Sequence, residues 1–119
     1  MKFFMPEQLR CLTANGRWNK ERRRLNQTPS DFRPIVRLFL LGTPFQWLLS
    51  EIDPENLMVA FGLADLGHGI PETGFVSLDY LGEVRGPDHE KVEVDHRFRA
   101  GRSISAYANE ARLFGRILM

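Results

Sequence analysis

The chain has 119 residues, 43% hydrophobic and 26% charged, with a net charge of +1, which is typical of a soluble globular protein. Its single cysteine, Cys11, excludes an internal disulfide and a cysteine-based zinc site, and no apolar run reaches the roughly 20 residues of a membrane-spanning helix. Too few apolar residues precede Pro6 for a secretory signal. We therefore expect one domain over residues 1–119, in the reducing cytoplasm and without membrane contact.

Residues 1–30 predict a basic, helical N-terminal segment. The stretch PEQLRCLTA, residues 6–14, predicts a helix with Pro6 in its first turn. The dipeptide Asn15-Gly16 is a strong stop signal. Residues 17–25 then predict a second, polar helix with little to bury beyond Trp18 and Leu25.

Residues 34–119 predict a sheet followed by a C-terminal helix. Bulky and β-branched runs bounded by Gly, Pro and Asp turns indicate strands, and Gly62 marks a bulge or a close approach of two backbones. Successive strands favour an α+β fold, a mostly antiparallel sheet of four or five strands with helices at the N- and C-terminal ends. The predicted strands are residues 35–41, 45–52, 57–66, 74–78 and 91–98.

Serine caps predict the two later helices. Ser77 is expected to cap a short helix over residues 78–84, and Ser103 or Ser105 to cap a helix over 104–115 that stops at Gly115. The last helix is expected to bury an apolar stripe of Ala106, Ala108, Ala111, Leu113 and Phe114.

Charge is segregated along the chain despite the small net value. Residues 1–40 hold nine Lys or Arg and three acids, residues 51–95 hold eleven acids and two bases, and residues 96–119 hold five Arg and one Glu. Such a pattern indicates either two partner-facing surfaces of opposite sign or two surfaces that neutralise each other within the fold.

Several segments, in this order, resemble a known bacterial family. They are LTANGR, DFRPIVRLF, WLLSEIDPEN, AFGLADLGHGIPETGFVSL, EVRGP and ISAYANEARLFGRI, and they resemble the family known as domain of unknown function 2958. The resemblance spans Leu9 to Ile117. It implies no particular chemistry, but it implies a setting, because members are typically carried by plasmids and other mobile elements. The chain departs from the family pattern at His68, where an apolar residue is expected, and in a longer arginine run after Asn19.

The best candidate site is a group of four carboxylates at strand ends. If the strand register brought them together, they could hold a magnesium or calcium ion, or one could act as a general base. The alternative is that they make turn bonds, end strands or lie in solvent. These residues are Glu51, Asp53, Asp65 and Glu72.

Other chemically suggestive residues have simpler explanations. The spacing of His68, His89 and His96 matches no compact zinc motif, so we expect them to face solvent. Cys11 is expected to share the dry side of a helix with Leu12. The glycine-rich loop of residues 62–74 lacks Lys and Arg, which excludes a phosphate-binding loop.

The N-terminal basic cluster offers a nucleic-acid hypothesis. Its cations could bind phosphates while Trp18 stacks on a base; alternatively, the same cations pair with the acidic middle of the chain. The cluster consists of Arg17, Lys20, Arg22, Arg23 and Arg24 beside Trp18.

Our leading hypothesis is a non-enzymatic protein-binding accessory of a mobile element. It would contact a partner with a basic surface, for example a host DNA-targeting defence complex, through acids flanked by the aromatic anchors Phe75 and Tyr80. The second hypothesis is nucleic-acid binding, and the third is a metal-dependent hydrolase on Glu51, Asp65 and Glu72. We assign no cofactor and no catalytic residue. The acidic contact set is Glu51, Asp53, Asp65, Glu72 and Asp79.

Overall fold

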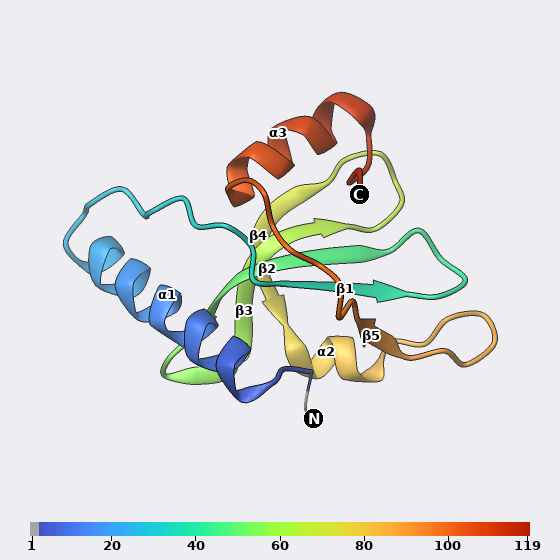
Figure 1. Cartoon of the computed structure of the whole chain (residues 1–119), viewed down its shortest axis with the longest axis horizontal. Coiled ribbons are helices and arrows are strands. Elements are labelled where there is room, and N and C mark those ends of the chain that lie inside the picture. The colour runs from blue at the N-terminus through green and yellow to red at the C-terminus, as the bar shows by residue number, and fades with distance from the viewer. Residues whose placement is uncertain (1–2) are drawn as a thin grey trace.

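Five strands form one antiparallel sheet in the order β4-β3-β2-β1-β5 in the computed structural model, which describes residues 3–119 (Figure 1). Within these residues, helices lie before β1, after β4 and after β5. The predicted α+β fold is therefore confirmed. The elements are α1 (Pro6–Arg24), β1 (Val36–Leu40), β2 (Gln46–Asp53), β3 (Asn56–Asp65), β4 (Glu72–Ser77), α2 (Leu78–Glu83), β5 (Val92–Val94) and α3 (Ile104–Phe114).

The two faces of the sheet carry separate hydrophobic cores, because side chains alternate along each strand. One core contains Leu12 of α1 and Leu49 of β2. The other contains Leu48 of β2 and Ala111 of α3. Helices α1 and α3 therefore cover opposite faces, and they lie apart in Figure 1 with strands between them. Within the described residues, no helix combines the length and apolar character needed to cross a membrane.

Helix α1 runs without interruption through Asn15 and Gly16, so the break predicted there is wrong. The side-chain amide of Asn15 donates to the carbonyl oxygen of Ser50 in β2 at 3.0 Å. Trp18 and Leu25, which were expected to be buried, are 55% and 49% exposed. Small and polar residues, rather than an apolar stripe, therefore fix the middle of α1 on the sheet.

Gly16 is the point of closest approach between α1 and β2. A Cβ at this position would lie 1.9 Å from the carbonyl oxygen of Ile52, so any side chain would force the helix off the strand. Asn15-Gly16 therefore does not end the helix. Its glycine instead allows the backbones of α1 and β2 to come into contact.

A bulge in β2 interrupts its pairing with β3. Leu49 pairs with Gly62 and Glu51 with Phe61, which leaves Ser50 as the extra residue. Gly62 lies opposite the bulge, and a Cβ there would meet the carbonyl oxygen of Leu48 at 1.9 Å. The predicted close approach at Gly62 is confirmed, with the extra residue on the partner strand.

The predicted caps of α2 and α3 are confirmed, whereas the predictions for β5 and for the buried face of α3 need correction. Ser77 and Ser103 accept backbone N–H bonds at the starts of α2 and α3, and Gly115 ends α3 in the left-handed conformation. The strand predicted over 91–98 is shorter, since β5 ends at Val94. The predicted stripe of α3 is wrong at its end, because Leu113 and Phe114 are exposed; the helix buries Ile104, Tyr107, Ala108 and Ala111.

The close contact at Gly16 generates a stability prediction. Gly16→Ala should lower the free energy of unfolding by about 1–3 kcal/mol through overpacking, although alanine is favoured over glycine in an exposed helix by about 1 kcal/mol. Urea denaturation measures the change. The control Arg17→Ala, at an exposed position of the same helix, should stay within about 0.5 kcal/mol of the wild type. A Gly16→Ala variant as stable as the wild type would contradict the close approach.

Candidate binding cleft

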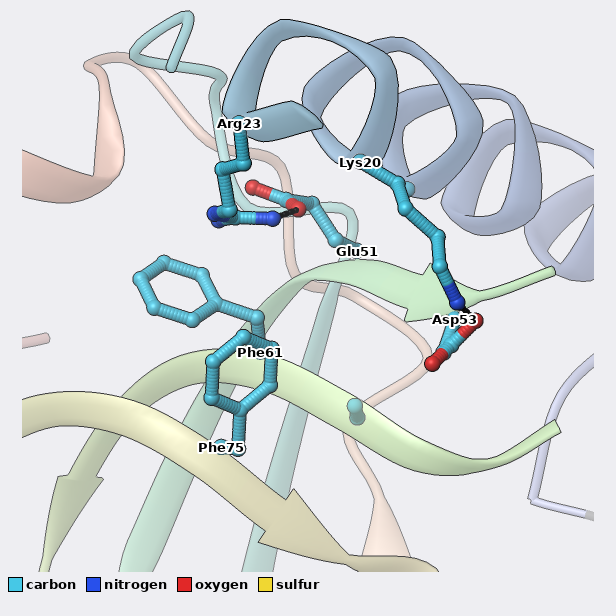
Figure 2. Close-up of a pocket in the computed structure, with 8 residues that line it drawn as sticks. Lys20, Arg23, Glu51, Asp53, Phe61 and Phe75 are labelled. Atoms are coloured by element: carbon cyan, nitrogen blue, oxygen red, sulfur yellow. Dashed lines mark hydrogen bonds and ion pairs between the residues drawn. The ribbon is translucent and has the colours of Figure 1, made fainter. Parts of the chain in front are cut away.

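The C-terminal half of α1 places two cations over the hairpin of β2 and β3. Gly16, Lys20 and Arg23 line one pocket, as expected for residues three or four positions apart on one helix face. The opposite wall comes from the hairpin and from Phe75 of β4. Figure 2 shows Lys20 and Arg23 reaching from the helix towards Asp53 and Glu51.

Glu51 is the most deeply buried charge of this cleft, with 4% of its surface exposed. Its Oε2 accepts from the side-chain amide of buried Asn19 at 2.8 Å, and its Oε1 lies 3.5 Å from a guanidinium nitrogen of Arg23. Burial raises the pKa of Glu51, and the contacts with Asn19 and Arg23 offset this only in part. Glu51 is therefore a carboxylate that lies inside a cleft and is only weakly ion-paired.

Asn19 joins three parts of the chain. Besides bonding to Glu51, its amide donates to the carbonyl oxygen of Ser30 at 3.0 Å, and its Oδ1 accepts from the Ser30 N–H at 2.7 Å. Helix α1, the segment after it and β2 are thereby fixed together at one buried amide.

Lys20 and Asp53 form the outer ion pair of the cleft. Lys20 Nζ lies 2.9 Å from Asp53 Oδ1 and 3.5 Å from Glu55 Oε1. The hydrogen bond from Lys20 lowers the pKa of Asp53 and raises that of Lys20. Because Lys20 is substantially exposed, this pair contributes orientation more than stability.

Two phenylalanine rings hold the guanidinium of Arg23. The Arg23 Cζ lies 5.6 Å from the Phe61 ring centroid and 5.5 Å from that of Phe75, and the two rings pack edge-to-face (Figure 2). Hollows of ≈ 190 and ≈ 490 Å³ share Arg23, Glu51, Phe61 and Phe75 in their walls. We call these two hollows the Arg23–Glu51 cleft.

The cleft opens beside an unpaired edge of the sheet. Strand β4 pairs with β3 on one side, and no strand of residues 3–119 pairs with its other side. Phe75 in the middle of β4 is 66% exposed. The opposite edge strand, β5, has only three residues, so β4 offers the longer free edge.

The family model described as "Protein of unknown function (DUF2958)" matches residues 3–118. The chain belongs to this family. Comparisons with curated proteins and with solved structures found no match. Membership of this family therefore assigns no activity to the chain. Any function proposed for this DUF2958 chain depends on its own residues.

The four predicted carboxylates do not come together. Gln46 lies opposite Asp65, so Asp65 is five residues along the sheet from the position of Glu51, roughly 16 Å away. Asp65 is buried, and its oxygens accept from the N–H groups of Gly67 and Ile117. It fixes the chain after α3 to the sheet. Residues 3–119 contain no group of three His, Cys, Asp or Glu side chains able to hold a metal ion.

Two acids of the predicted contact set and both predicted aromatic anchors do lie along one segment. This segment, residues 72–80, comprises β4 and the start of α2, and all four members are exposed. They are Glu72, Phe75, Asp79 and Tyr80. Glu51 and Asp53 belong to the Arg23–Glu51 cleft instead, where cations of α1 face them.

The predicted basic cluster is largely engaged within the fold. Lys20 and Arg23 pair with acids of β2, Arg24 pairs with Glu21, and Arg22 donates to the carbonyl oxygen of Thr28. The alternative that basic and acidic segments neutralise each other therefore describes the α1–β2 contact.

The remaining candidates are exposed. The three histidines lie at the surface, and Cys11 is exposed rather than on the dry side with Leu12.

Sequence reasoning missed Asn19, although an uncharged amide inside an arginine-rich helix is a signal that could have indicated a buried contact.

The burial of Glu51 generates a pH prediction. Its raised pKa means that the folded state keeps this proton to higher pH than the unfolded chain, whose glutamate has the ordinary value of 4.5. Between these two pKa values the folded state binds more protons, so stability falls as pH rises. Relative to the wild type, Glu51→Gln should therefore gain stability as pH increases through this window.

Urea denaturation of both proteins at a series of pH values around and above 4.5 measures this effect. Glu55→Gln is the matched control, since the Glu55 side chain is 77% exposed. A difference between Glu51→Gln and wild type that stays constant with pH would contradict a raised Glu51 pKa.

Proposed function

We propose that this chain is a non-enzymatic binding protein that acts by contact with another protein. The observation that carries the proposal is the free edge of β4 with Phe75 exposed at its centre. A free edge presents a row of backbone donors and acceptors, and a partner segment in extended conformation can add to it as a further strand.

The surroundings of β4 support strand addition. Two hollows, of ≈ 490 and ≈ 340 Å³, both include Thr73 and Phe75 in their walls. In strand addition the backbone supplies affinity and pockets for alternate side chains supply specificity. Phe75 resembles an interface anchor, because it is aromatic, exposed and backed by the Arg23 guanidinium.

Charge favours a basic partner segment. Glu72 and Asp79 flank Phe75 and Tyr80 and are exposed, and neither forms an ion pair within residues 3–119. In the setting implied by the family resemblance, a mobile element in the bacterial cytoplasm, we propose a host DNA-targeting defence complex as the partner. Proteins that bind DNA present basic surfaces, which complement such acids.

Affinity capture from nuclease-treated lysate of a bacterial host, followed by binding measurements with the purified partner, tests the proposal. Phe75→Ala should weaken binding about 30-fold, which corresponds to the loss of about 2 kcal/mol at an anchor residue. The control Leu113→Ala removes an exposed apolar side chain, 83% accessible, from α3 and should leave affinity unchanged.

Hydrogen exchange of the complex locates the contact. Amides of β4 should exchange more slowly when the partner is bound, and Glu72→Lys with Asp79→Lys should weaken binding most at low salt. A partner whose affinity is unaffected by Phe75→Ala, and whose binding leaves β4 exchange unchanged, would refute the strand-addition mechanism.

A further inference from the structure

A second groove lies on another part of the molecule. It has a volume of ≈ 540 Å³ and lies between the first half of α1, residues 33–35 and residues 96–100. It shares no lining residue with the Arg23–Glu51 cleft. The residues that matter for its chemistry are Glu7, Gln8, Cys11, Arg33, His96 and Arg99.

The arginines of this groove have no acidic partner. Arg33 and Arg99 are exposed, and neither forms an ion pair with a carboxylate of residues 3–119. A guanidinium nitrogen of Arg99 donates to the adjacent carbonyl oxygen of Phe98 at 2.8 Å, which orients the side chain. This differs from the predicted basic cluster, where Lys20 and Arg23 pair with β2.

The charge around the groove is positive. Glu7 is the single acid among the lining residues. Arg10 and Arg97 are exposed beside lining residues in the sequence and also form no ion pair within residues 3–119. Two arginines free of acidic partners therefore line the groove, and two more are sequence neighbours of its lining residues.

We propose that this groove binds the phosphate backbone of single-stranded nucleic acid. Guanidinium groups fit phosphates in bidentate geometry. A polynucleotide carries a charge at every residue, so it can meet arginines from two separate segments at once, whatever its sequence. Phe98, the phenylalanine of the groove, is buried at 7% exposure, so binding depends on arginine contacts to phosphates, which carry no sequence information.

The expected salt dependence follows from the number of contacts. Two to four phosphate contacts give a slope of log K against log salt concentration of about −1.4 to −2.8 for single strands. This proposal is independent of strand addition at β4, since the two surfaces share no residue.

Fluorescence anisotropy of the full chain with a labelled single-stranded DNA of mixed sequence tests the proposal. Arg33→Glu combined with Arg99→Glu should weaken binding at least about tenfold. The matched control is Arg112→Glu combined with Arg116→Glu, which makes the same change in net charge at two exposed positions outside the groove and should weaken binding far less.

Cys11 gives a second readout that needs no substitution. It is the only cysteine of the chain and lines the groove in an exposed position, so bound DNA should slow its alkylation by iodoacetamide. Equal losses in the two double variants, no binding at low salt, or no protection of Cys11 would overturn the proposal. Competition by polyglutamate as effective as that by unlabelled DNA would also overturn it, in favour of an acidic protein segment.

Discussion

The contact between the backbones of α1 and β2 at Gly16 is the constraint on which the rest of the molecule depends. With no side chain between helix and strand, α1 lies close enough for the short amides of Asn15 and Asn19 to reach β2 directly. Residues one and two turns beyond Gly16 then face the hairpin, which brings Lys20 and Arg23 to its acids. A longer separation would leave the same charges in solvent, where they would contribute little.

The bulge at Ser50 works together with this contact. The extra residue shifts the register so that Glu51 lies opposite Phe61, next to the Phe61–Phe75 pair. The carbonyl oxygen of Ser50 is the one that Asn15 bonds. The bulge in β2 therefore supplies the carbonyl oxygen that bonds to α1, and it also places the Glu51 carboxylate beside two aromatic rings. For this reason the cleft forms at this end of the sheet.

Features with local causes could be predicted from the sequence. The strands, the caps at Ser77 and Ser103 and the stop at Gly115 depend on residues within one turn or one strand of each other. The path of α1 could not be predicted in this way, because Asn15-Gly16 has the same composition whether it ends a helix or packs it against a strand. A helix divided at Gly16 has no continuous face, so the sequence indicated that the N-terminal cations could pair with the acidic middle of the chain but not that Lys20 and Arg23 would meet β2. The burial of α3 was misjudged because its buried residues, Ile104, Tyr107, Ala108 and Ala111, follow the i, i+3, i+4, i+7 spacing of one helix face, and this spacing places Leu113 on the opposite side.

The segment between α1 and β1 has no regular structure, yet both ends of the chain hold it. Asn19 bonds to Ser30 on one side, while the backbone N–H of Ser105 donates to Asp31 and that of Ile104 to the carbonyl oxygen of Phe32 on the other. During synthesis on the ribosome these residues emerge long before α3 exists. The bonds from Ile104 and Ser105 can form only after those two residues have been made, so this segment is held on the α1 side before it is held on the α3 side.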